Sequence, residues 1–338
     1  MKIKKTYTPE ELHYLQLLAK QYPTVQAAST EIINLQAIMN LPKGTEHFIS
    51  DIHGEYEAFE HILNSCSGEI RNKLDEHFGD TLTSVEKNDI ATLIHYPSAK
   101  LTLIADQVDD LDNWYRITLH HLVQLCRYVS IKHTRNKVRS FLPKGYEQII
   151  DELIHMRDED GSKRIQFENL IDSIVQIGQA SDVIQALCNV IKSLTCDHLH
   201  IVGDIFDRGP RADIVMDSLM NCHSVDIQWG NHDIIWMGAA TGHWASIANL
   251  LRMNISYNNF DMLEVGYGIN LRPLATFAEK VYGDDPCQFF RPHMLDYNKF
   301  DQVPEDLAAK MHKAIAICQF KCEGQRIKAH PEYNLDKR

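Results

Sequence analysis

Three short clusters of polar residues carry side chains that could bind a metal ion and move a proton. They are Ser50-Asp51-Ile52-His53-Gly54, Gly203-Asp204-Ile205-Phe206-Asp207-Arg208-Gly209 and Gly230-Asn231-His232-Asp233. Each follows a short run that is typical of a strand. Carboxylate, imidazole and amide groups are ligands suited to Mn²⁺, Fe or Zn²⁺. The three clusters are therefore candidate parts of one site.

The first cluster places a carboxylate and an imidazole two residues apart. On a turn that leaves a strand, Asp51 and His53 can point at the same ion. Taken alone, an Asp-x-His triplet is also typical of a solvated turn, and for this cluster that alternative stays open.

The second cluster follows the apolar run Leu199 to Val202. Asp204 comes first, and its two oxygens could bridge two cations. Asp207 is placed to orient a neighbouring side chain, and Arg208 offers a planar fork for a phosphate. The flanking glycines allow a sharp turn beside an ion. A loop of solvated charges is the alternative, but it requires all of these residue types to coincide by accident.

The third cluster adds a neutral oxygen ligand and a proton carrier. Asn231 can give its carbonyl oxygen to a metal, and His232 is a candidate general acid or base. If Asp207 accepts a hydrogen bond from His232, the imidazole is held in one tautomer and its protonated form is favoured. It could then give a proton to a leaving alkoxide. A lone histidine is more often structural. The role of His232 as a proton donor is therefore expected only because it lies in the third polar cluster.

The elements that must position these clusters are three strand-and-helix units. Their alternation predicts an α/β fold with polar residues at the carboxyl ends of the strands. A large helical block separates the first unit from the second. We expect helices over residues 8–22, 24–40, 55–66, most of 79–157, 164–195, 216–222 and 234–254, a loop at 282–292, and a last helix from about Pro304.

Composition narrows the classes of function. The 338 residues carry a net charge of −12, which argues against non-specific binding of nucleic acid but allows an anionic substrate beside metal ions. The longest apolar segments are too short to cross a bilayer. Eight cysteines without a Cys-x-x-Cys pair, and a start MKIKK unlike a secretory leader, predict reduced thiols and a cytoplasmic protein.

In this order the clusters read D-x-H, G-D-x-x-D-R-G and G-N-H-D, a combination that resembles the calcineurin-like metallophosphoesterase superfamily. The longer stretches HFISDIHGEYEAFEHIL, HIVGDIFDRGPRAD and IQWGNHDIIWMGAA, with a helical block between the first two, are similar to the class III fructose-1,6-bisphosphatases of low-GC Gram-positive bacteria. Ser/Thr protein phosphatases share the clusters but join the first two through a much shorter segment. The similarity covers essentially the whole chain.

The resemblance implies a layered β-sandwich with flanking helices. It further implies one metallophosphoesterase domain over residues 1–338, with a helical insertion at about 80–195. It also implies a dinuclear Mn²⁺ site. Asp51, His53 and Asp204 would hold one ion, and Asp204 and Asn231 would hold the other.

The resemblance also implies the reaction, which is hydrolysis of the 1-phosphate of fructose 1,6-bisphosphate to fructose 6-phosphate and phosphate, a step of gluconeogenesis. A metal-activated hydroxide would attack phosphorus in line. Arg208 would steady the phosphoryl oxygens. His232, oriented by Asp207, would protonate the departing sugar oxygen.

One departure from the family concerns the second metal. The superfamily completes that shell with two later histidines, whereas here only His243, His293, His312 and His330 follow the third cluster. Gly242-His243 resembles the late motif but falls on a predicted helix. We therefore expect a chain that resembles the N-terminal part of the family, incomplete at its C-terminus.

Three explanations for this stay open, namely a truncated gene product, a fragment of a longer protein, or a half that needs a separately encoded partner. Truncation is the expectation. A homo-oligomer is also open. The competing functions are another calcineurin-like phosphoesterase, acting on proteins or dinucleoside polyphosphates, and a non-catalytic remnant that binds at most one metal. The helical insertion and the stretch WGNHDIIWMGAA argue against the first of these.

Overall fold

The computed structural model describes residues 7–156, 161–293, 303–335 and 337. The lysine-rich start lies outside these residues. By its contacts the chain divides into two compact units. One comprises Met1–Gly44, Glu76–Gly79 and Pro97–Leu194, and the other comprises Thr45–Asp75, Asp80–Tyr96 and Thr195–Arg338.

The first unit is helical, as the periodicity predicts. Helix α1 (Pro9–Gln21) begins at Thr8, whose side chain accepts a hydrogen bond from the Glu11 N–H while the Glu11 carboxylate accepts one from the Thr8 N–H. Helix α2 (Val25–Met39) follows, and neither helix buries a residue. The other helices of this unit are α6 (Pro97–Gln107), α7 (Leu111–Ser130), α8 (Arg135–Ser140), α9 (Glu147–His155), α10 (Ser162–Gln176) and α11 (Ala180–Thr195).

The core of the first unit forms where α7 contacts α9 and α10. These helices place one apolar stripe inward, as their amphipathic sequences predict. Fully buried members include Leu119, Leu122, Ile150, Leu153 and Ile171. Among the described residues no single helix is long and apolar enough to cross a membrane; only α10 and α11 together pass such a test, and they are bent by 118° at their junction.

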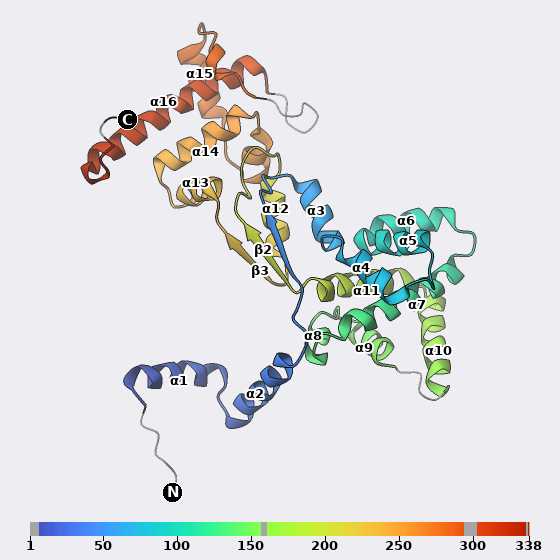
Figure 1. Cartoon of the computed structure of the whole chain (residues 1–338). Helices are drawn as coiled ribbons and strands as arrows, with labels where there is room; N and C mark the ends of the chain where they lie inside the picture. The colour runs from blue at the N-terminus through green and yellow to red at the C-terminus, as the bar shows by residue number, and fades with distance from the viewer. Residues whose placement is uncertain (1–6, 157–160, 294–302, 336, 338) are drawn as a thin grey trace. The chain divides into compact units, whose positions relative to one another are not determined.

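The second unit contains a parallel sheet in the order β1 (Glu46–Ser50), β2 (His198–Val202) and β3 (Val225–Gln228). Each strand leads into a helix, namely α3 (Tyr56–Ser65), α12 (Ala212–Met220) and α13 (Asn231–Ala240). The three predicted strand-and-helix units are thus confirmed. All three polar clusters lie at the carboxyl edge of the sheet, because neighbouring parallel strands end on the same side (Figure 1).

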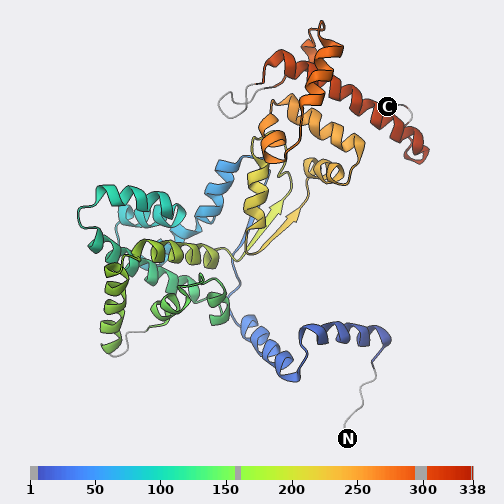
Figure 2. The same cartoon turned by 180° about the vertical axis from the view of Figure 1, so that it is seen from behind.

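The two faces of this sheet differ sharply. On one face the buried side chains Leu199 and Ile201 pack with Phe59 of α3 and Val215 of α12, and both views show α12 beside the strands (Figures 1 and 2). The opposite face carries Phe48, which is 66% exposed. Side chains alternate between the faces because a strand has a period of two residues.

The expectation of a β-sandwich is not met in the described residues, where these three strands form a single sheet. The described part is α/β and mostly helical. Helical periodicity occupies most of the sequence outside the three short strands, so little of it is left to build a second layer of strands. Helices α4 (Glu69–Phe78), which the two units share, and α5 (Ser84–His95) complete the segment after α3.

The single helix expected over residues 234–254 is in fact two. Helix α13 ends at Ala240, and α14 (Trp244–Ser256) begins after Gly242, whose φ of +83° breaks the helical path. His243 caps α14, since its Nδ1 accepts a hydrogen bond from the Ser246 N–H at 3.3 Å.

The remaining elements form a helical group with a core of its own. They are the π-helical η1 (Met262–Gly266), α15 (Arg272–Tyr282), the 3-10 turn η2 (Gln288–Phe290), α16 (Glu305–Ala329) and η3 (Pro331–Tyr333). Helices α14 and α15 contact α16. The helix expected from about Pro304 is therefore confirmed, and the expected loop at 282–292 contains only the short turn η2. All eight cysteines are free.

Candidate metal centre

Three residues of the first two clusters adopt a backbone conformation that side chains other than glycine rarely take. Asp51, His53 and Asp204 each have a φ of +52°. Such a left-handed residue costs roughly 1–3 kcal/mol and persists where the surrounding structure requires it, often at functional sites. The three strained residues are the three carboxylate and imidazole ligands expected for one metal ion.

The side chains of these three residues converge. One ligand atom from each of Asp51, His53 and Asp204 lies within 4.8 Å of the other two. The His53 Nε2 atom is 3.7 Å from an oxygen of Asp51. The backbone also joins the two turns, since the His53 N–H donates to the Asp204 carbonyl oxygen at 2.8 Å. The first two clusters therefore form one group of candidate ligands.

Two glycines let the turns approach this closely. A Cβ atom on Gly230 would collide with the carboxylate and backbone nitrogen of Asp204, and one on Gly209 would collide with the carbonyl oxygen of His53. The Gly209 carbonyl oxygen also accepts a hydrogen bond from Asn259 Nδ2 at 2.8 Å. The glycines of the second and third clusters are thus required by close contact.

Asp207 lies at the centre of the charged groups. It is buried, and its carboxylate oxygens lie 3.6 Å from His232 Nε2, 3.9 Å from His53 Nδ1 and 3.7 Å from Arg208 Nε. Asp207 and His232, which we expect to pair, are therefore in contact. Their distance of 3.6 Å is that of an ion pair, since it is too long for a hydrogen bond. The other ring nitrogen of His232 lies 3.1 Å from the sulfur of Met253.

The third cluster reaches the first two through the start of α13. The His232 N–H faces an oxygen of Asp204 at 3.3 Å. Asn231 precedes it as the first residue of the helix, is exposed, and makes no side-chain hydrogen bond within the described residues. Arg208 is half exposed, so its guanidinium is accessible to an anion.

Two further residues, Asp233 and Met253, hold the clusters in place, although the sequence alone does not assign them this role. Asp233 is buried and accepts hydrogen bonds from the N–H groups of Phe206 at 3.0 Å and Gly230 at 2.8 Å, which ties the second cluster to the third. An acidic residue three positions after the residue that precedes a helix is a capping signal that could have indicated this. The contact of Met253 with His232 has no such local signal.

The four later histidines have other roles in the described residues. His243 caps α14, and His312 is partly buried and donates to the Phe290 carbonyl oxygen at 2.8 Å. Burial lowers the pKa of His312. His330 stacks on the ring of Tyr333. For His293 the structure gives a backbone hydrogen bond to the Ser256 carbonyl oxygen.

Comparison with known proteins extends this picture. Residues 13–338 match the family model described as Firmicute fructose-1,6-bisphosphatase. The relatives called fructose-1,6-bisphosphatase class 3 include one from Clostridium tetani, 54% identical over 327 residues, and one from Clostridium acetobutylicum, 53% identical over 329 residues. A third, from Listeria innocua, is 49% identical over 328 residues. No solved structure matches the chain.

The matches cover nearly all of this chain but only about half of each relative. Each alignment covers 97% of this chain but 49% or 50% of the relative. The chain thus spans about half the length of the curated relatives it matches. The expectation that it resembles the N-terminal part only is not borne out, because the matches give the share that is covered and not its place in the relative.

Proposed function

The chain belongs to the Firmicute fructose-1,6-bisphosphatase family, and from this membership we propose that it hydrolyses fructose 1,6-bisphosphate to fructose 6-phosphate and phosphate. One observation carries the proposal. The ligand atoms of Asp51, His53 and Asp204 converge within 4.8 Å of one another at the ends of two neighbouring strands. That donor set suits a metal centre that activates water for hydrolysis.

The residues of the centre fit the metal that the family implies. Two carboxylates and one imidazole suit Mn²⁺, so Asp51, His53 and Asp204 would hold one ion. Asp204 and Asn231 would hold the second. When bound, such a pair draws charge from the phosphoryl oxygens and activates the attacking water.

The remaining side chains serve binding and proton transfer. Arg208 is exposed enough to pair with phosphoryl oxygens, and its charge is partly offset by Asp207. His232 faces one acceptor with each ring nitrogen, an oxygen of Asp207 and the sulfur of Met253. The 3.6 Å contact with Asp207 is too long for a hydrogen bond, so Nε2 would be the atom that gives a proton to the departing sugar oxygen.

The finer features of the fold belong to the same proposal. They are a calcineurin-like arrangement, one metallophosphoesterase domain over residues 1–338 and a helical insertion at about 80–195. The helices α5 to α11, between the first and second polar clusters, support the insertion. A homo-oligomer and a separately encoded half stay predictions from the sequence.

Phosphate release by the full chain tests the proposal. With Mn²⁺ present, we expect turnover of fructose 1,6-bisphosphate well above that of fructose 6-phosphate. Asp204→Asn should lower it by at least about 100-fold, because the shared ligand loses charge. The exposed Asp217→Asn on α12 is the matched control and should keep full activity.

Two results would contradict it. Activity that survives Asp204→Asn would place the chemistry elsewhere. A preference for a phosphopeptide or a dinucleoside polyphosphate over the sugar bisphosphate would favour another phosphoesterase function at the same centre.

A further inference from the structure

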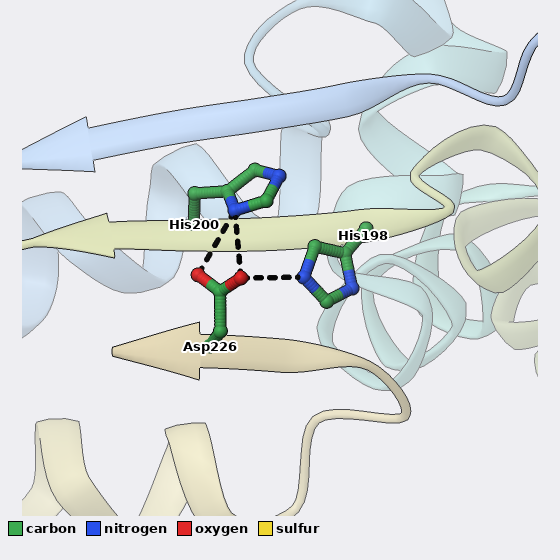
Figure 3. A group of neighbouring side chains, drawn as sticks. All are labelled: His198, His200 and Asp226. Carbon is green, nitrogen blue, oxygen red and sulfur yellow. Dashed lines mark hydrogen bonds and ion pairs between the residues drawn. The ribbon is translucent and has the colours of Figure 1, made fainter. Parts of the chain in front are cut away.

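A second group of metal-binding side chains lies away from the polar clusters, on the face of the sheet opposite its core. His198 and His200 alternate with the buried Leu199 and Ile201 along β2, so both imidazoles project to the same side. Asp226 of β3 pairs with His200 in the register of the two strands. The three side chains point toward one another (Figure 3).

The distances within this group are short. His198 Nε2 lies 3.1 Å from Asp226, and His200 Nδ1 lies 2.9 and 3.0 Å from the two oxygens of the same carboxylate. One ligand atom from each of the three residues lies within 4.8 Å of the other two. Two imidazole nitrogens and a carboxylate oxygen thus face a common point.

Neighbouring groups fix the orientation of both rings. The other nitrogen of His198, Nδ1, lies 2.6 Å from the hydroxyl of Ser224. The ring of His200 stacks on Phe48 with 4.4 Å between their centroids. A histidine that binds a metal usually has its second nitrogen hydrogen-bonded to an oxygen, and His198 meets this condition whereas His200 is held by stacking. The ligands also project from strands, which hold side chains more precisely than loops do.

The hydrogen bonds within this group leave one nitrogen atom, Nε2 of His200, without a partner in the described part of the chain. If both imidazoles donate to Asp226, the Nε2 atom of His200 is left as an acceptor. That atom is buried and has no hydrogen-bond partner in the described part of the chain. This atom lies on the side of the ring away from Asp226 (Figure 3), so an ion held by Nδ1 would not contact it, and the case for an ion rests on the three converging ligand atoms.

The ligand set selects a class of ion. Two imidazoles and one carboxylate leave a fourth position open, which is the arrangement of many zinc sites. Mg²⁺ and Ca²⁺ prefer sites made of oxygen alone.

We propose that His198, His200 and Asp226 form a Zn²⁺ site on the open face of the sheet, separate from the metal centre at the carboxyl edge. The two sites use different parts of β2. The strand ends at Val202, two residues or about 7 Å beyond His200, and Asp204 lies beyond that end. The zinc site stands on its own observations and does not depend on the proposed phosphatase activity.

The test is a metal titration of the full chain after chelation. The double variant Asp51→Asn/Asp204→Asn removes the carboxylates of the edge centre, and calorimetry should still show about one Zn²⁺ per chain. Co²⁺ in its place should give the visible absorption of a tetrahedral complex. Binding of no stoichiometric Zn²⁺ by the double variant would overturn the proposal.

Variants of the group itself then assign the site. In the same background, Asp226→Asn should weaken Zn²⁺ binding by at least about 100-fold, and Ser224→Ala by about 10-fold because it loosens His198. His47→Asn is the matched control, since His47 lies on the opposite face of β1. Equal affinity in Asp226→Asn and in the control would refute the assignment.

A measurement on the unaltered chain covers the case in which a variant fails to fold. Diethyl pyrocarbonate modifies accessible imidazoles, and peptide mass spectrometry locates the modified residues. Zn²⁺ should protect His198 but leave His47 unchanged. Loss of reactivity at the edge centre alone, with His198 still reactive, would show that Zn²⁺ binds only there.

Discussion

An oxygen of Asp207 lies 3.6 Å from His232 Nε2, while the Nδ1 atom of the same imidazole lies 3.1 Å from the sulfur of Met253. A thioether sulfur can only accept a hydrogen bond, and so can an ionised carboxylate. Each ring nitrogen therefore faces an acceptor. His232 thus links Asp207 of the second cluster to Met253 of α14, a helix that begins more than ten residues after the third cluster. These two contacts fix the position from which His232 would donate a proton.

His232→Asn should slow hydrolysis of fructose 1,6-bisphosphate by about 10²–10⁴-fold, the usual range for loss of a general acid. Its effect on 4-nitrophenyl phosphate should be far smaller, because nitrophenolate leaves without needing a proton. Steady-state rates on the two substrates measure the difference. Equal losses on both would show that His232 does not protonate the leaving group.

Met253→Leu should leave stability within about 1.5 kcal/mol, since the two side chains have similar volumes. It removes the sulfur that faces His232 Nδ1, so turnover of the sugar bisphosphate should fall several-fold. Met311→Leu, which alters a buried methionine of α16 without contact to the centre, is the control. Identical rates for the two variants would show that the sulfur does not position the imidazole.

Asp233→Ala should destabilise the second unit, because the buried N–H of Phe206 and the partly buried N–H of Gly230 lose their acceptor. Each unpaired group costs about 1–3 kcal/mol. Asp233→Asn keeps one acceptor oxygen and should lose less. Urea unfolding gives the free energies of unfolding, and a loss in Asp233→Ala no larger than that of the exposed Asp217→Ala would refute the bracing role.

Gly209→Ala should lower the free energy of unfolding by about 1–3 kcal/mol and weaken Mn²⁺ binding, because its new methyl group collides with the His53 carbonyl oxygen. Gly324→Ala in α16 meets open space and should instead stabilise the chain by about 0.5–1 kcal/mol. Thermal unfolding and Mn²⁺ titration distinguish them. If Gly209→Ala changed neither the free energy of unfolding nor Mn²⁺ binding, the close contact between the turns at His53 and Gly209 would not be required.

The helical unit should show a pH dependence centred on Asp151. Hydrogen bonds from Arg139 and Arg135 lower its pKa from 3.8 to about 2. A lowered carboxyl pKa contributes stability that is fully present above pH 3.8 and is lost as the pH falls toward 2. Asp151→Asn should therefore be about 1–2 kcal/mol less stable near pH 6.

Chemical unfolding at several pH values checks this sign. The gap between the unaltered chain and Asp151→Asn should narrow steadily below about pH 4. The exposed Glu152→Gln in the middle of α9 serves as the control with no such gap. A gap that widened toward acid would contradict the assignment of the ion pairs.

Local signals were enough to predict most of the elements around the site. The apolar run Leu199 to Val202 and the turn glycines each act over a few residues, and the structure has them where the sequence indicates. Gly242 was ambiguous, since a single glycine can lie within a helix or end one. In the structure it ends one, since the His243 N–H donates to the Gly238 carbonyl oxygen across a left-handed Gly242.

The contacts made across the fold were harder to predict. The family resemblance implied that Asp51, His53 and Asp204 share one ion, and their ligand atoms do converge at the ends of two parallel strands. The sulfur of Met253 reaches His232 only through the packing of α14. The meeting of His198 and His200 with Asp226 has no signal in the sequence, because an alternating strand does not indicate what lies on the next strand.

The three left-handed residues at Asp51, His53 and Asp204 have a consequence for protein engineering. Glycine takes a positive φ without strain, so glycine at any of these positions should relieve local strain while removing a ligand. A selection for heat resistance alone would therefore favour sequences without the centre. Chains improved in that way need a screen for metal binding at every round, since their rising melting temperature would conceal the loss.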